Sequence, residues 1–102
     1  MGLTIEVQDE FGGTLSTTTD PKNLLTHLLP EFGDTEYPML GCIDPYGDTT
    51  FNRPQITLFL AEWSAVSSKA KTLEEKELAA SIESMAQRVR ENVHLYLKFI
   101  GD

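Results

Sequence analysis

Residues 72–102 read TLEEKELAASIESMAQRVRENVHLYLKFIGD, and two different apolar periodicities follow each other directly in this stretch. Thr72, with Glu75 three residues later, forms a capping box, which predicts that a helix begins at Thr72. The apolar residues that follow recur at helical spacing: Leu78, Ile82, Met85, Val89 and Val93. The stretch therefore begins with a long amphipathic helix that presents one apolar stripe to a core.

The periodicity changes after His94. Leu95, Leu97 and Phe99 alternate with the residues between them, and a period of two is typical of a half-buried strand. A strand of this kind needs a partner. The other clear alternation, over Leu3–Val7 near the start of the sequence, is the natural candidate. We therefore expect the first and last strands to share one sheet.

A second helix is expected immediately before the first, beginning at Asn52. Asn52 and Gln55, three residues later, form another capping box. Its apolar stripe consists of Ile56, Phe59, Leu60, Trp63 and Val66. The short break at residues 67–71 predicts an antiparallel helical hairpin with Trp63 in its core.

The N-terminal half carries less regular signals. Phe11-Gly12-Gly13 is a turn signal, and residues 15–19 are expected to return as a second strand. Asp20-Pro21 predicts the start of a short helix that Pro30 ends. Residues 31–52, called the acidic connector below, contain a short apolar run over Met39–Ile43 that predicts a buried strand.

These elements together predict an α+β fold class. A small, mainly antiparallel sheet of about three to four strands packs against an α-helical hairpin plus one short helix. With 102 residues, the chain is expected to form a single domain over 1–102. No apolar run approaches the roughly 18 residues that cross a bilayer, and the N-terminal residues lack a signal-peptide pattern. With one cysteine, Cys42, these features favour the cytoplasm.

Net charge is distributed unevenly along the chain. The sequence carries a formal net charge of -8, and residues 1–52 contain Lys22 as their one base. Their acids are Glu6, Asp9, Glu10, Asp20, Glu31, Asp34, Glu36, Asp44 and Asp48. Such a field repels nucleic acid and anionic membranes and attracts basic partners, although acidity also serves solubility alone.

The densest motif of the acidic connector is Asp44–Asn52, DPYGDTTFN. Asp-Pro followed by Gly is ordinary turn chemistry. A second interpretation makes Asp44, Tyr46 and Asp48 a presented recognition patch, because Tyr offers both apolar area and a hydroxyl. A third makes Asp44, Asp48 and Asn52 oxygen ligands of a metal, although their spacing departs from that of an EF-hand loop.

Catalytic motifs are not found. The chain has no phosphate-binding glycine loop and no Gly-x-Ser-x-Gly elbow. Cys42 lies in an apolar run, where a buried and inert thiol is expected, and nothing pairs it with His27. His94 is expected near the carbonyl end of the last helix. We expect no cofactor, no metal and no enzymatic activity.

Two segments carry a resemblance to known proteins. Asp44–Asn52 and His94–Asp102 (HLYLKFIGD) resemble a small group of uncharacterised bacterial proteins of about this length, a likeness that implies no established activity. The small size, the acidity and the missing catalytic motif also resemble immunity proteins of bacterial toxin systems. That second resemblance implies a protein that binds and neutralises a toxin.

The leading hypothesis is therefore a non-enzymatic protein that occludes a basic toxin domain. Its expected contact residues are Glu31, Asp34, Glu36, Tyr37, Asp44, Tyr46 and Asp48. One alternative is a small enzyme or ligand-binding domain with a site in the acidic connector, using Asp44, Asp48 and either His94 or Asp102. A homodimer formed through a sheet edge is a further alternative.

Overall fold

Four antiparallel strands form the sheet of the computed structural model, which describes residues 2–101. They are β1 (Thr4–Gln8), β2 (Thr14–Thr19), β3 (Asp48–Phe51) and β4 (Tyr96–Ile100). Their order across the sheet is β2-β1-β4-β3. β1 and β4 occupy the centre, with Thr4 opposite Ile100, so the expected pairing of the first and last strands is confirmed.

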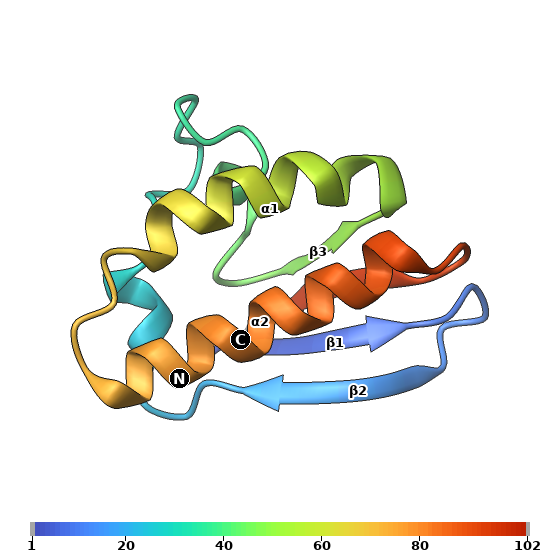
Figure 1. The fold of residues 1–102 in the computed structure, drawn as a ribbon, viewed down its shortest axis with the longest axis horizontal. Coiled ribbons are helices and arrows are strands. Elements are labelled where there is room, and N and C mark those ends of the chain that lie inside the picture. The colour runs from blue at the N-terminus through green and yellow to red at the C-terminus, as the bar shows by residue number, and fades with distance from the viewer. Residues whose placement is uncertain (1, 102) are drawn as a thin grey trace.

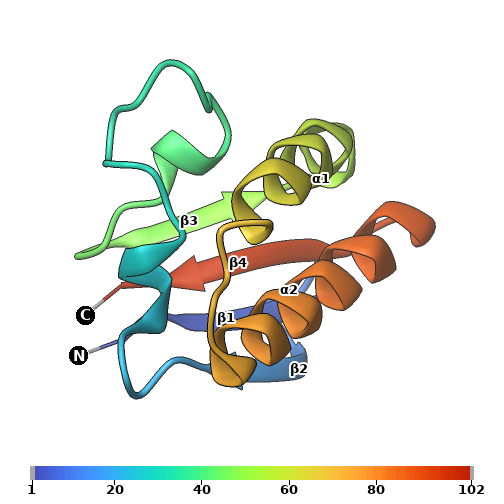
Figure 2. The same ribbon diagram turned by 60° about the vertical axis from the view of Figure 1, so that its left-hand side comes forward.

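Two helices, α1 (Arg53–Ser67) and α2 (Leu73–Glu91), lie side by side on one face of this sheet, as Figures 1 and 2 show. Both begin where the capping boxes predicted. The Asn52 side chain accepts a hydrogen bond from the Gln55 amide, and the Thr72 side chain accepts one from the Glu75 amide. Among residues 2–101, no helix has the length and apolar character needed to span a membrane. The predicted α+β class is confirmed.

The core lies between the helices and the sheet. Along β1 and β4, alternate residues are buried, as the period of two requires. Four aromatic rings meet there with centroids between 5.2 and 6.0 Å apart: Phe51, Phe59, Trp63 and Phe99. Trp63 Nε1 donates a 3.0 Å hydrogen bond to the Ala79 carbonyl, which joins α1 to α2 and confirms Trp63 as a core residue.

Polar side chains lie on the opposite face of the sheet, which no helix within residues 2–101 covers. Glu6 on β1 lies opposite Lys98 on β4, and Lys98 Nζ is 3.5 Å from a carboxylate oxygen of Asp48 on β3. From β2, on the other side of β1, the Thr14 hydroxyl donates a hydrogen bond to Glu6 at 3.0 Å. These side chains satisfy one another, which fits a solvated sheet face.

Two buried carboxylates hold the single-turn 3-10 helix η1 (Leu24–His27). Asp20 accepts hydrogen bonds from the amides of Leu24 and Leu25, at 2.8 and 2.9 Å. Glu75 on α2 lies 3.0 Å from His27 Nδ1 at the other end of the turn. The expected short helix is thus present only as this turn, because Asp20 binds amides four and five residues ahead instead of capping a helix at Pro21.

The acidic connector differs from expectation at two places. Met39–Ile43 is not a strand: it contains a second 3-10 helix, η2 (Leu40–Cys42), whose end is closed by the Ile43 amide on the Leu40 carbonyl. The third strand is β3 instead, inside the Asp44–Asn52 motif, for which no strand was predicted. Its residues pair with β4 from Asp48 to Phe51, and this long-range pairing has no local sequence signal.

The end of α2 also differs. The helix ends at Glu91, so Val93, which was predicted to belong to the apolar stripe, lies outside the helix and is 59% exposed. Asn92 Nδ2 donates to the Arg88 carbonyl at 2.7 Å. His94 does not meet the helix end as expected. It turns the chain with a φ of 71° and places Nδ1 3.2 Å from Glu10.

Candidate functional site

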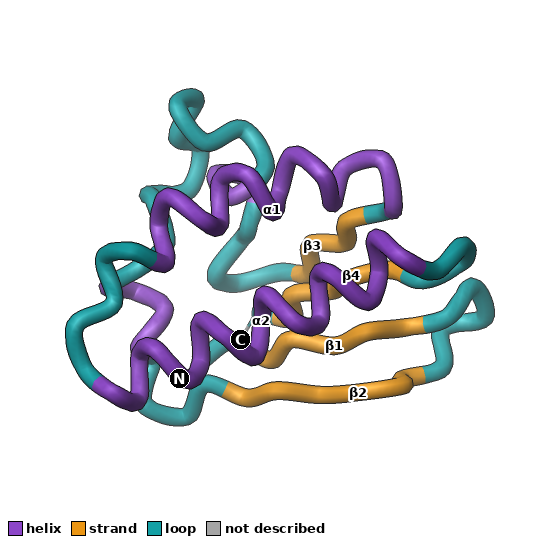
Figure 3. The backbone as a smooth tube through the Cα atoms, viewed as in Figure 1, coloured by secondary structure: helices purple, strands orange, loops and turns teal. Residues whose placement is uncertain are grey.

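The acidic connector leaves η1 and returns to the sheet as β3, and Figure 3 shows most of it as loop that stands beside α1. A carboxylate from α1 holds its middle. Glu62 accepts hydrogen bonds from the Met39 amide at 3.1 Å and from the Leu40 amide at 2.9 Å. This long loop is therefore an anchored structure, and its side chains are presented from a fixed backbone.

Backbone contacts within the loop fix it further. The Gly33 amide donates to the Gly41 carbonyl at 2.8 Å, and the Gly41 amide donates to the Tyr37 carbonyl at 2.6 Å. A side chain at position 41 would collide with the Asp34 carbonyl, so only glycine allows this close approach. Tyr37 packs against the core, with Lys69 Nζ 5.8 Å from its ring centroid.

The five acids of the connector have different surroundings. Glu31 and Glu36 are exposed. Asp34 and Asp44 each accept a hydrogen bond from an amide two residues ahead, at 2.8 and 2.9 Å, which is turn chemistry. Asp48 lies on β3 and pairs with Lys98. Within the described part of the chain, the other four carboxylates make no ion pair.

Exposed aromatic rings accompany these charges. Tyr46 is 83% exposed and Phe32 is 62% exposed, and neither belongs to the core. Tyr46 was expected at a contact surface from the sequence, but Phe32 was not. Tyr37 is half-buried and Asp48 is paired, so both are less free for a partner than the sequence indicated.

An apolar groove lies where η1 meets the connector, and sequence reasoning missed it. Its volume is about 260 Å³, and Glu31 and Pro45 both line it. The two residues come from opposite ends of the loop, and the fold brings them together with Leu29 and Phe32. The apolar signal was present in the sequence, but nothing local showed that Pro45 returns to the same place.

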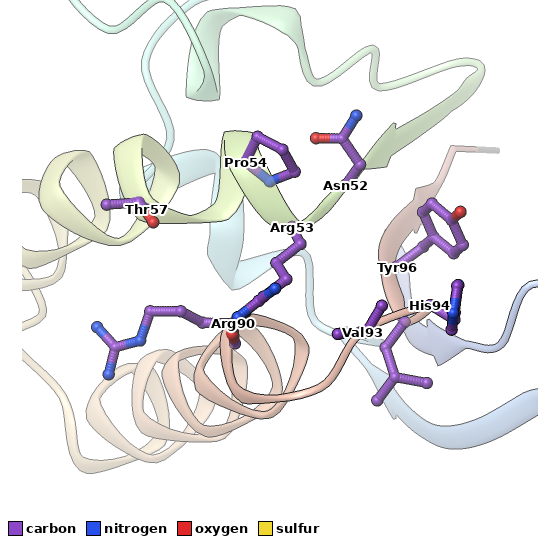
Figure 4. Close-up of a pocket in the computed structure, with 9 residues that line it drawn as sticks. Asn52, Arg53, Pro54, Thr57, Arg90, Val93, His94 and Tyr96 are labelled. Carbon is purple, nitrogen blue, oxygen red and sulfur yellow. Dashed lines mark hydrogen bonds between the residues drawn. The ribbon is translucent and has the colours of Figure 1, made fainter.

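A larger open cavity, of about 600 Å³, lies at the other end of the helices and is drawn in Figure 4. Arg53 Nε reaches across it and donates to the Arg90 carbonyl at 3.0 Å. Figure 4 shows the Arg90 and His94 side chains directed away from each other, so these two side chains do not converge on one point.

Two members of the alternative site, Asp48 and His94, lie at opposite ends of β4. Asp48 lies opposite Ile100 at one end of β4, whereas His94 precedes the other end at Tyr96. β4 has five residues, so the strand from Tyr96 to Ile100 spans about 13 Å. Asp102 lies outside the described residues.

The metal and thiol interpretations can be checked against the same structure. Within residues 2–101, no three His, Cys, Asp or Glu side chains are grouped to hold a metal ion. Asn52 uses its side-chain oxygen to cap α1. Cys42 was expected to be buried, but its side chain is exposed and hydrogen-bonds to the Pro38 carbonyl at 3.1 Å, because η2 turns it out of the core.

Comparison of the chain with protein-family models, with curated proteins and with solved structures finds no match. The function is therefore argued from the residues of the chain itself.

Proposed function

We propose that the protein is a non-enzymatic binding protein of the immunity type, which neutralises a basic bacterial toxin domain by covering its active site. One observation carries this proposal: the acidic connector is anchored to the body, yet four of its five carboxylates have no cationic partner within the described residues. A partner that carries Lys and Arg would supply the missing counter-charges.

The exposed aromatics support a protein partner over a solvated surface alone. Aromatic side chains supply much of the contact energy of interfaces, and charged residues around them raise the association rate. Phe32 and Tyr46 lie in the same segment as Glu31, Glu36 and Asp44. The connector therefore combines the two properties that a recognition surface for a basic protein requires.

The test is a triple variant, Glu31→Gln, Glu36→Gln and Asp44→Asn, measured by stopped-flow association with a basic toxin domain that the native protein neutralises. We expect association to slow about tenfold at low salt and to become nearly independent of salt concentration. Glu77→Gln, Glu83→Gln and Glu91→Gln form the matched control, because they remove three exposed charges from α2.

Equal rates for the native protein and the connector variant would contradict the proposal. So would an equal slowing by the α2 control, because the effect would then follow net charge instead of the connector.

A further inference from the structure

The apolar groove beside the connector has a closed floor and an open rim. Leu25, Ile43 and Leu3 form the floor, with exposed fractions of 1%, 4% and 8%. The rim includes Leu29, half-buried, and Phe32, whose side chain is mostly exposed. The floor of the groove is therefore aliphatic, Asn23 and Thr26 add polar groups to its lining, and an aromatic ring stands at its edge.

The size of the groove limits what can fill it. A volume of about 260 Å³ is the space of about nine waters at about 30 Å³ each. Waters over an aliphatic floor find few hydrogen-bond partners, so an apolar group that replaces them gains free energy. One large side chain fits this space, whereas a folded element does not.

The charge around the groove defines what must accompany that side chain. Glu31 is the one charged residue that lines it among the described residues, and it makes no ion pair within the described part of the chain. The neighbouring connector adds further carboxylates and contains no Lys or Arg. An occupant with a cation beside its apolar group is therefore favoured over a neutral or acidic one.

We infer that this groove is the anchor site for an aromatic side chain of the partner protein, with an adjacent Arg or Lys of that partner placed against Glu31. The inference rests on the proposed function, because it specifies the chemistry of the partner at the same surface. Phe32 covers one side of the bound ring, and Glu31 selects the neighbouring cation.

The first test uses short probes with the intact protein. N-acetyl-Phe-Arg-amide, N-acetyl-Phe-Glu-amide and N-acetyl-Ala-Arg-amide are titrated while the methyl NMR signals of Leu25, Leu29 and Ile43 are followed. We expect Phe-Arg to shift these signals and to bind about threefold to tenfold more tightly than Phe-Glu. Ala-Arg is expected to leave them unchanged. Absent methyl shifts, or equal affinity for Phe-Arg and Phe-Glu, would overturn the inference.

The second test uses matched variants. Phe32→Ala is expected to weaken Phe-Arg binding about fivefold, and Glu31→Gln is expected to remove the preference over Phe-Glu. Phe11→Ala and Glu83→Gln are the controls. Phe11 is an exposed ring in the β1–β2 turn, and Glu83 is an exposed acid of α2 that does not line the groove. Controls with the same effects as the groove variants would place binding elsewhere.

These outcomes separate the inference from the proposed function. If the toxin domain depends on the connector acids but Phe32→Ala affects neither the probe nor the toxin, the anchor site is wrong and the proposed function stands. If Phe-Arg binds in the groove but the association rate of the toxin domain does not depend on the connector acids, the proposed function is wrong. The groove then remains a site for aromatic side chains beside a cation.

Discussion

Glu75 joins three parts of the chain through one carboxylate. It accepts hydrogen bonds from the amides of Lys71 and Thr72, at 2.9 and 3.2 Å, and lies 3.0 Å from His27 Nδ1. The Lys71 amide, followed by His27 and the Thr72 amide, lowers the pKa of Glu75 to about 2. The same residue therefore completes the cap of α2 and fastens η1 to that helix.

Lowering the pH should remove the stability that the Glu75 carboxylate contributes. The pKa of Glu75 is lower in the folded protein than its ordinary value of 4.5, so the ionised carboxylate stabilises the fold above pH 4.5. That contribution is lost as the pH falls toward 2. Urea denaturation of the native protein is expected to show a larger drop in stability between pH 4.5 and pH 2 than Glu75→Gln. An equal drop in stability for the native protein and for Glu75→Gln would contradict this role of Glu75. Glu77→Gln, an exposed neighbour, serves as the control.

Glu62 is the corresponding residue for the connector, because it holds the amides of Met39 and Leu40. Glu62→Gln keeps the length of the side chain but replaces its charge, and hydrogen bonds to charged groups are the stronger kind. We expect a loss of about 1–2 kcal/mol in the free energy of unfolding. Faster hydrogen exchange at the two amides should accompany this loss.

The exposed Glu83 on α2 provides the comparison for Glu62. Glu83→Gln should leave both the stability and the two amides unchanged. Amide exchange that Glu62→Gln does not alter would show that the carboxylate is dispensable for holding the loop.

Among the secondary-structure elements, the two long helices were predicted correctly from local signals, whereas the short helix after Asp20, the run 39–43 and β3 were not. Both capping boxes placed the starts of α1 and α2 at Asn52 and Thr72, since each cap needs only residues within one turn. Residues 39–43 were misassigned because an apolar run of five fits a strand or a tight turn equally well. β3 was missed because its pairing with β4 is a contact between distant segments.

The connector behaves as an element of its own, and Gly41 is the residue on which its backbone depends. Gly41→Ala places a Cβ against the Asp34 carbonyl, so the loop must shift. We expect a cost of about 1–3 kcal/mol, in the range of overpacked sites. Limited proteolysis should then cut within residues 31–47 while circular dichroism keeps the helical signal.

Thr35→Ala, in the same loop but exposed, is the control for Gly41→Ala. If Gly41→Ala resisted proteolysis as well as the native protein does, the loop would not need the close approach at Gly41.

On the scale of the whole molecule, the charge asymmetry of the sequence separates the acidic connector from the helical hairpin. The sequence placed the net negative charge in residues 1–52, outside the helical hairpin, since the count needs no structure. The sequence did not show which carboxylates lack a cation, because the Asp48–Lys98 pair joins residues that are far apart in the chain. The groove was unpredictable for the same reason, since residues from three separate segments line it.

Uncompensated charge also affects the stability of the molecule. Two like charges about 10 Å apart in water repel by about 0.4 kcal/mol, and salt screens this repulsion. With a net charge of -8, the protein should gain about 1 kcal/mol of stability between low and high salt, a rise in melting temperature of about 4–8 °C. Sodium chloride is the salt to use in a thermal scan. The triple variant of the connector acids should show a smaller rise, and a melting temperature that falls with salt would contradict the expectation.

The central position of β1 and β4 has a consequence for folding kinetics. Thr4 and Ile100 are paired in the middle of the sheet although almost the whole described chain lies between them. Bringing such distant residues together costs loop-closure entropy before the favourable contact forms. Proteins rich in distant contacts therefore fold slowly. The helical hairpin and the β1–β2 hairpin can form early from local contacts. The insertion of β4 between β1 and β3 is then the step that completes the sheet, and until it occurs the inner edges of both strands remain open to pairing with another chain.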